Sequence, residues 1–204
     1  MMSLIGFDVF SCSYIAVLYL MTGLKVKNND VLFVSMFNMI IMRAWISFST
    51  SMIIFDRSSS YQTLIPQAII EIIICYIAED MCGYFIHRYM HRNKFLYIHV
   101  HQQHHRNQTD SFITAFDVHI VELVAFYFVG LLIGPTLISQ FWRISFLGYN
   151  MWLCAATFFL IWSHTGLNVK WMPDTTFHNL HHKYYTVNYG TAFSDYLFGT
   201  AKWN

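Results

Sequence analysis

The sequence predicts an all-α protein, an integral membrane helical bundle with about four to five transmembrane helices. Of its 204 residues, 56% are hydrophobic and only 11% are charged, whereas globular domains carry roughly 25% charged residues. The apolar residues gather in stretches of about 20, the length that spans a bilayer. The eleven histidines lie in two polar blocks between or after these stretches. The bundle is therefore expected to carry a helical cap rich in histidine.

Five apolar stretches are long enough to cross a membrane. They cover residues 4–24, 31–55, 64–86, 120–141 and 144–163. The third stretch carries Glu71, Glu79 and Asp80, which are costly in hydrocarbon unless they face protein or a polar cavity. A short link joins the last two stretches, so we expect them to form an antiparallel hairpin.

The polar residues fall into two blocks, 87–119 and 164–204, on either side of that hairpin. Because an even number of crossings separates the blocks, they lie on one side of the membrane. Nine basic residues are expected on this side, against Arg57 and Arg143 on the other. Short cytosolic loops carry an excess of Lys and Arg, so we expect the helical cap to be cytosolic.

Charge and cysteine content narrow the possible functions. The formal net charge is +1 and the sequence contains no run of Lys and Arg, which argues against a nucleic-acid partner. The cysteines Cys12, Cys75, Cys82 and Cys154 lie in apolar segments without Cys-x-x-Cys spacing. They are interpreted as small buried apolar residues.

The histidines form three short patterns. These are His87-x-x-x-His91, His101-x-x-His104-His105 and His178-x-x-His181-His182. Residues spaced by three or four share one face of a helix, so each pattern can direct two or three imidazoles to one point. Adventitious metal-binding tracts are short and contiguous, whereas the hairpin separates these patterns. His164, at the cytosolic end of the last stretch, is positioned to join them. The sequence therefore predicts a metal site.

Eight or nine imidazoles are too many for one ion, so we expect a di-metal site. Imidazole binds Zn, Cu, Fe and Ni alike and does not select among them. The sequence lacks the His-Glu-x-x-His motif of zinc hydrolases. It also lacks the paired Glu-x-x-His motifs of carboxylate di-iron bundles. Redox chemistry at an all-histidine site beside a bilayer remains as the interpretation.

Longer motifs surround these histidines. They are Asp80-x-x-x-Tyr84-x-x-His87-Arg88-x-x-His91, Leu96-Tyr97-x-His99-x-His101-x-x-His104-His105, and His178-x-x-His181-His182 followed by Asn188-Tyr189-Gly190 and Asp195-x-Leu197-Phe198-Gly199. Over about residues 76–200 the chain resembles the fatty acid hydroxylase and sterol desaturase superfamily. The last two motifs are most similar to sterol desaturases.

The resemblance implies a non-haem di-iron centre that uses dioxygen to hydroxylate or desaturate a sterol or fatty acyl chain in the endoplasmic reticulum membrane. It implies these metal ligands: His87, His91, His101, His104, His105, His164, His178, His181 and His182. Zinc is expected only as an artefact of expression. On this basis we expect residues 1–60 to be an N-terminal membrane anchor region and residues 61–204 the catalytic domain.

The electrons for such a reaction need a separate source. The sequence has no Gly-rich dinucleotide motif and no Cys-x-x-Cys-His haem attachment motif. The resemblance implies cytochrome b5 or a comparable reductase as the electron donor.

Three further residues are candidates to support the ligands. Asp80 lies two helical turns before His87, so it is expected to accept a hydrogen bond from a ligand's distal nitrogen. His119 and Glu122 stand where the family often has His-Pro-x-Glu, with proline replaced here, and are candidates for the same kind of role. Leu160 occupies a position where some members have a further histidine.

Other functions stay open at this stage. A membrane di-haem cytochrome would carry single histidines inside opposing helices, rather than clusters at one edge. A metal transporter would line its path with histidines or acids, for which only the acids of stretch 64–86 are candidates. An inactive family member is also possible. The sequence does not identify the lipid or decide between hydroxylation and desaturation.

Overall fold

The computed structural model describes residues 15–16, 19, 29–53, 55, 61–107 and 111–203. Every regular element in these residues is a helix, so the predicted all-α class is confirmed. The longer elements are α2 (Asn29–Met52), α3 (Tyr61–Arg92), the π-helix η3 (Leu123–Gly130), α7 (Leu131–Ile138) and α8 (Phe146–Ser163). The shorter ones are α4 (Lys94–Leu96), the π-helix η1 (Tyr97–His101), α5 (Gln102–His105), the 3-10 helix η2 (Phe112–Phe116), α6 (Ile120–Glu122), α9 (Thr176–Tyr184) and α10 (Ala192–Leu197).

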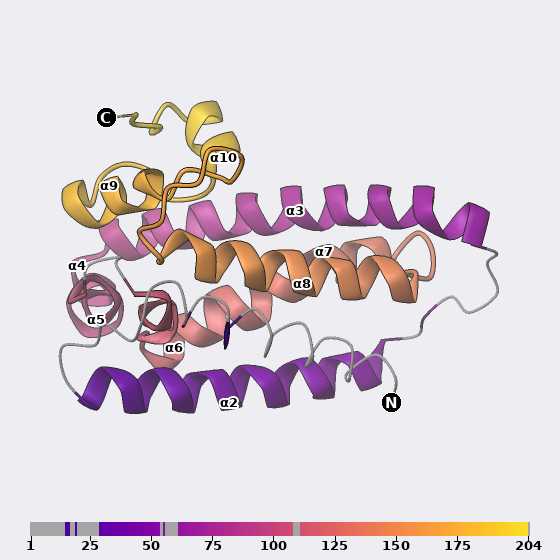
Figure 1. Ribbon diagram of the computed structural model, residues 1–204, viewed down its shortest axis with the longest axis horizontal. Helices are drawn as coiled ribbons and strands as arrows, with labels where there is room; N and C mark the ends of the chain where they lie inside the picture. The colour runs from indigo at the N-terminus through magenta and orange to yellow at the C-terminus, as the bar shows by residue number, and fades with distance from the viewer. Residues whose placement is uncertain are drawn as a thin grey trace.

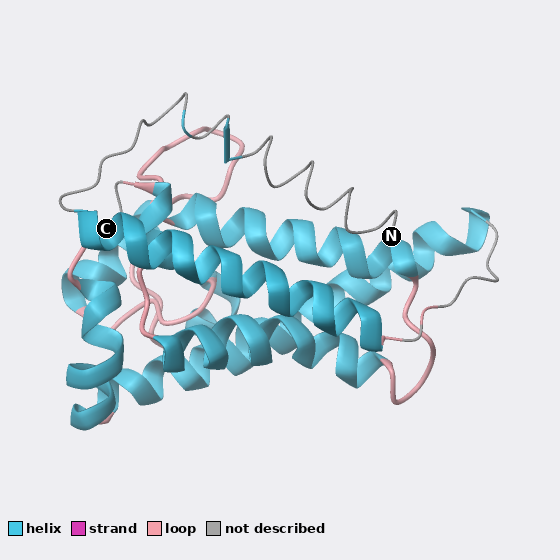
Figure 2. Cartoon of the chain, turned by 90° about the horizontal axis from the view of Figure 1, so that it is seen from below, coloured by secondary structure: helices cyan, strands magenta, loops and turns pink. Residues whose placement is uncertain are grey.

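The long helices run side by side along the longest axis of the molecule (Figure 1). The short helices α4, α5, α9 and α10 gather at one end of this bundle, where α3 ends and the chain leaves α8 (Figures 1 and 2). The fold is thus a bundle with a helical cap at one end, as the sequence predicts.

Three helical segments are long and apolar enough to cross a membrane. They are Asn29–Met52, Ile120–Ile138 and Phe146–Ser163, and they match three of the predicted stretches. The predicted stretch 64–86 lies within α3 and carries the three acidic residues noted above. The predicted stretch 4–24, the loop with Lys25 and Lys27, and Arg57 lie outside the described residues.

Glu71 shows how α3 accommodates an acid among apolar residues. Its carboxylate accepts hydrogen bonds from the backbone N–H of Ser145 at 2.8 Å, from Trp142 Nε1 at 3.2 Å and from Gln67 Nε2 at 2.9 Å. The hydroxyl of Ser145 also donates to it. A buried carboxylate that is fully hydrogen-bonded avoids most of the cost of burial. Glu71 thereby ties the turn between α7 and α8 to α3, and the predicted hairpin is held against the bundle.

The packing of α7 on α3 depends on a glycine. A Cβ added at Gly134 would collide with the backbone and side chain of Cys75 in α3, so only glycine allows this close approach. Large buried side chains belong to the same core as Cys75, among them Ile46, Leu123, Trp152 and Ile161. This packing holds α3 and α8 beside each other and brings their ends to the cap.

Asp117 anchors the segment that follows α5. It is fully buried and accepts hydrogen bonds from Arg106 Nε at 2.8 Å and Nη2 at 2.6 Å, and from Gln103 Nε2 at 3.3 Å. Asn107 also donates to its carboxylate. A bidentate arginine with further donors fixes both the position and the orientation of a carboxylate. The cap is therefore held to the bundle by directed polar contacts.

Candidate metal centre

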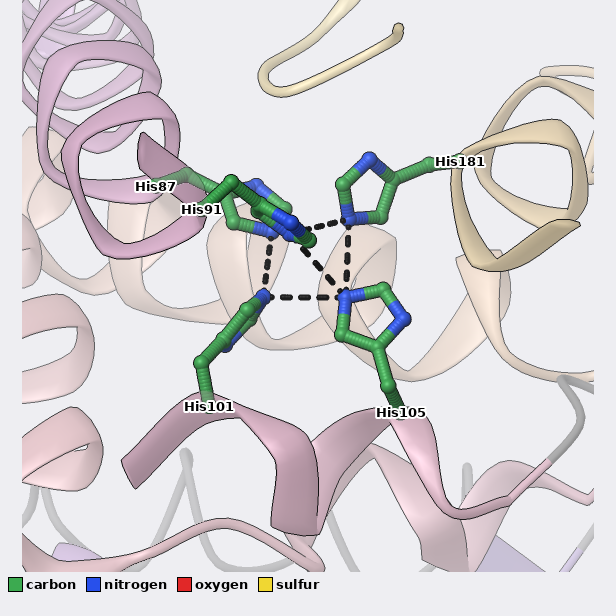
Figure 3. Close-up of side chains that lie close together, drawn as sticks. All are labelled: His87, His91, His101, His105 and His181. Carbon is green, nitrogen blue, oxygen red and sulfur yellow. Dashed lines mark hydrogen bonds between the residues drawn. The ribbon is translucent and has the colours of Figure 1, made fainter. Parts of the chain in front are cut away.

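All nine histidines predicted as ligands meet in the cap, where they form two groups. The five-histidine group contains His87 and His91 from α3, His101 from η1, His105 from α5 and His181 from α9 (Figure 3). The four-histidine group contains His104 from α5, His164 at the end of α8, and His178 and His182 from α9. Within each group the candidate ligand nitrogens all lie within 4.8 Å of one another.

The five-histidine group has closely spaced Nε2 atoms that point toward a common centre (Figure 3). The Nε2–Nε2 distances are 2.9 Å for His87 and His101, 3.0 Å for His101 and His105, and 3.1 Å for His105 and His181. His91 Nε2 lies 3.1 Å from that of His105 and 3.1 Å from that of His181. Two nitrogens about 2.1 Å from one ion and at right angles would be about 3 Å apart. The residues therefore fit a transition-metal ion.

The four-histidine group has similar spacing. The Nε2 atoms of His164 and His178 are 3.1 Å apart, as are those of His178 and His182. His104 Nε2 lies 3.2 Å from that of His182 and 3.4 Å from that of His164. These distances lie between about 3.0 and 3.4 Å, the separations of neighbouring ligands in octahedral and tetrahedral sites. This group also fits a metal ion.

The two groups are neighbours because the His-x-x-His-His patterns divide between them. In α9, His178 and His182 face the four-histidine group, while His181 faces the other group. His104 and His105 divide in the same way. The ring centroids of His105 and His182, from different groups, are 4.6 Å apart. Residues spaced by four share a helix face, so His178 and His182 face the same group. His181 lies between them in the chain and turns its ring to the other group.

Backbone carbonyls orient four of these rings through Nδ1. The pairs are His87 with Tyr189 O at 2.5 Å, His181 with Val187 O at 2.7 Å, His164 with Leu160 O at 3.0 Å, and His182 with Asn107 O at 3.2 Å. A carbonyl can only accept a hydrogen bond, so Nδ1 carries the proton and Nε2 presents a lone pair. This arrangement is typical of histidines that bind metals.

Burial keeps the imidazoles neutral. It lowers the pKa of His164 to about 4, and burial together with neighbouring imidazoles lowers the pKa of His182 to about 3. The pKa values of His104 and His178 are lowered for the same reasons. Metal binding requires neutral imidazole. At pH 7 the site is therefore in the form that binds a cation.

Two of the predicted supporting residues, Glu122 and His119, have different contacts. Glu122 Oε1 lies 3.0 Å from Nδ1 of His101, and both side chains are buried. His119 begins α6, where its Nδ1 accepts a hydrogen bond from the backbone N–H of Val121 at 3.2 Å. Of the two, Glu122 is the one placed against a predicted ligand.

Asp80 is expected from the sequence to contact a ligand's distal nitrogen, but its hydrogen bonds within the described residues go to the loop after Tyr189. Its carboxylate accepts hydrogen bonds from the N–H groups of Thr191 and Ser194, at 2.7 and 3.0 Å, and from the hydroxyl of Ser194 at 2.9 Å. These residues follow Tyr189, whose carbonyl orients His87. Asp80 therefore holds the loop whose carbonyl orients His87.

Asp195 and Asn188 build the same loop, a role that their sequence motifs do not reveal. Asp195 is buried and accepts hydrogen bonds from the N–H groups of Tyr189 at 2.9 Å and Gly190 at 2.6 Å. Asn188 has φ 56°, a conformation that asparagine tolerates, and its Nδ2 donates to Phe177 O at 2.7 Å. The Asn-Tyr-Gly and Asp-x-Leu-Phe-Gly motifs, to which these two residues belong, mark the loop in the sequence. Their contacts are visible only in the structure.

A cavity of about 680 Å³ connects the bundle interior with both histidine groups. Its walls are largely apolar and include Phe126, Leu131, Trp152 and Phe159. At one end it is bordered by His87 and His101 of the five-histidine group and by His104, His164 and His178 of the four-histidine group. A cavity of this size and lining fits a long apolar ligand.

Comparison with known proteins identifies the family. Residues 72–200 match the sequence profile of the fatty acid hydroxylase family. The chain belongs to this family. The resemblance that we inferred from the histidine motifs is thereby confirmed. No solved structure matches this fatty acid hydroxylase family member.

Its relatives modify several kinds of lipid. A candidate methylsterol monooxygenase of Dictyostelium discoideum is 32% identical over 147 residues, covering 67% of this chain and 52% of the relative. Sphinganine C4-monooxygenase 2 of Arabidopsis thaliana is 33% identical over 147 residues, covering 66% and 53%. A very-long-chain aldehyde decarbonylase of Oryza sativa subsp. japonica is 30% identical over 148 residues, covering 65% and 55%. The chain thus spans about half the length of these relatives.

Proposed function

We propose that this member of the fatty acid hydroxylase family is a membrane-bound oxidoreductase that uses dioxygen and a di-iron centre to hydroxylate or desaturate a lipid. One observation carries the proposal: two adjacent all-imidazole groups border an apolar cavity of about 680 Å³ inside a membrane bundle. The relatives named above support it, since they modify a sterol, a sphingoid base and a long-chain aldehyde.

The nine histidines of the two groups are the proposed ligands, five for one iron and four for the other. When bound, the iron pair supplies the activation of dioxygen that lets an unactivated C–H bond be broken. The four imidazoles that backbone carbonyls hold at Nδ1 are already oriented to bind the ions. Zinc fits the same nitrogens and is proposed only as a substitute acquired during expression. Residues 61–204 form the proposed catalytic domain, and residues 1–60 the anchor.

The cavity positions the lipid and excludes water. The rings of Phe126 and Phe159 form part of a wall along which an alkyl chain or sterol body can lie. Glu79 also lines the cavity. Its carboxylate forms no hydrogen bond or ion pair within the described residues, unlike the carboxylates of Glu71 and Asp80. An acid kept inside a membrane bundle commonly has a functional partner, and here a hydroxyl or amine of the lipid fits.

The reaction needs electrons from outside the chain. Hydroxylation consumes dioxygen, two electrons and two protons, and yields an alcohol and one water. Desaturation consumes the same reactants and yields an alkene and two waters. The proposed donor is cytochrome b5 or a comparable reductase. The proposed location is the endoplasmic reticulum membrane with the cap facing the cytosol, since most basic residues lie on the cap side.

The test combines metal analysis with lipid oxidation on the full chain purified in detergent. Wild type is expected to hold about two irons per chain, one for each group, and to oxidise added lipids when electrons are supplied. His104→Ala and His181→Ala, one from each group, are expected to bind iron more weakly and to oxidise lipid more slowly. His99→Ala is the matched control, because His99 lies in the cap but in neither group. Full iron loading without dioxygen consumption on sterol, sphingoid or acyl substrates would contradict the proposal.

A further inference from the structure

A second pocket reaches the five-histidine group from outside the lipid cavity. It has a volume of about 420 Å³, and its lining includes Arg88, His91, Arg92, Tyr97, Tyr185 and Tyr189. His91 borders this pocket, whereas His87 and His101 of the same group border the lipid cavity. The five-histidine group is therefore approached by two recesses, which share Tyr189 but otherwise have different linings.

The lining of this pocket is cationic and lacks a compensating acid. Arg88 and Arg92 are one helical turn apart in α3. Arg88 donates a hydrogen bond to the hydroxyl of Tyr84 at 2.6 Å, and neither arginine forms an ion pair within the described part of the chain. The ammonium groups of Lys183 and Lys202 lie near the adjacent Tyr184, at 5.2 and 4.7 Å from its ring centroid. Such a surface favours an anionic partner.

Tyr185 joins the surface of the pocket to the histidines. It ends α9 with φ 63°, a left-handed conformation that is strained for a bulky residue. Its ring centroid is 4.9 Å from that of His105, 6.3 Å from that of His91 and 6.2 Å from that of Tyr97. Its side chain is also exposed. Strain of this kind persists where the surroundings impose it and often marks functional sites.

We propose that this pocket is the docking site of an acidic one-electron carrier protein, which delivers electrons to the five-histidine group past Tyr185 and His91. The inference rests on the proposed function, because dioxygen-dependent oxidation takes two electrons per turnover. Two carriers are oxidised in succession, each losing one electron, and the two protons come from solvent. An anionic lipid is the weaker fit, since the larger apolar cavity, which suits acyl chains, is a different recess.

The test uses the metal-loaded full chain in detergent and the soluble domain of cytochrome b5 as the probe. Wild type is expected to bind the probe with an affinity that falls as salt is added. Reversing both charges, Arg88→Glu with Arg92→Glu, is expected to raise Kd at least about tenfold at unchanged metal content. Arg143→Glu, at the opposite end of the bundle beside the α7–α8 turn, is the control and is expected to bind as wild type. Tyr185→Gly, which relieves the backbone strain, is expected to bind the probe but to oxidise it more slowly when it is reduced.

The outcomes separate the two proposals. Unchanged probe affinity in the double charge reversal overturns the docking site. The docking site is also overturned if that variant raises KM for the lipid instead, because the pocket would then be a lipid headgroup site. Turnover driven by dithionite bypasses the carrier and is expected to be equal in wild type and the double variant. If neither dithionite nor the carrier supports lipid oxidation by wild type, the proposed function fails, while salt-dependent binding of the probe still tests the docking site.

Discussion

The division of the histidines into groups of five and four predicts unequal tolerance to the loss of one ligand. His178→Ala leaves three imidazoles in its group, whereas His181→Ala leaves four in the other. His181 is fully buried, and its replacement also frees the carbonyl of Val187, which lies 2.7 Å from its Nδ1. Both variants therefore lose metal affinity, but the four-histidine group should empty first.

The size of the effect follows from the number of ligands. Structural zinc sites with four protein ligands bind with about 10–16 kcal/mol, or about 2.5–4 kcal/mol per ligand. Since about 1.4 kcal/mol corresponds to a factor of ten, removing one ligand lowers affinity by a factor of about 60 to 700. A group that keeps four imidazoles still has a complete tetrahedral set. A group that keeps three does not.

The assay is competition for metal against a chelator of graded concentration, followed by metal analysis of the protein. His178→Ala is expected to fall from about two ions per chain to about one at a chelator concentration that His181→Ala withstands. His99→Ala serves as the control because its ring lies in neither group. If His178→Ala retained metal as well as His99→Ala, or if His181→Ala lost metal first, the assignment of five and four ligands would be refuted.

Three further predictions concern the support of the site and the bundle. Asp80→Ala should lower the melting temperature and the metal content together, because it leaves two backbone N–H groups without acceptors at a cost of about 1–3 kcal/mol each; metal loss without destabilisation would contradict this. Gly134→Ala should destabilise the bundle, whereas Gly130→Ala, whose added Cβ meets nothing closer than 3.7 Å, should be tolerated; equal melting temperatures would refute the close approach. Metal-free protein should lose stability as pH falls below about 6.5, since His164 and His182 have pKa values near 4 and 3 when folded and the unfolded chain binds more protons. A melting temperature constant from pH 7.5 to 5 would exclude that linkage.

Much of the site was predictable because its signals are local. The spacing of His178, His181 and His182 predicts neighbouring imidazoles on a helix, and the hairpin predicts that both polar blocks meet on one side. His164 was also expected to join them. These expectations need only helical periodicity and the length of a membrane span. The contacts of Asp80 were less predictable, because its partners Thr191 and Ser194 are more than 100 positions away in the chain.

The histidine patterns by themselves predicted a metal site in a membrane bundle, because ligand type and spacing are properties of the sequence. Only the tertiary structure decided how the ligands are shared. His181 and His182 are adjacent in the chain but face different groups, since successive residues on a helix point about 100° apart and each ring turns to what packs against its own face. The tertiary structure likewise decided that the larger cavity borders His87 and the smaller pocket borders His91, because different helices and loops surround each ring.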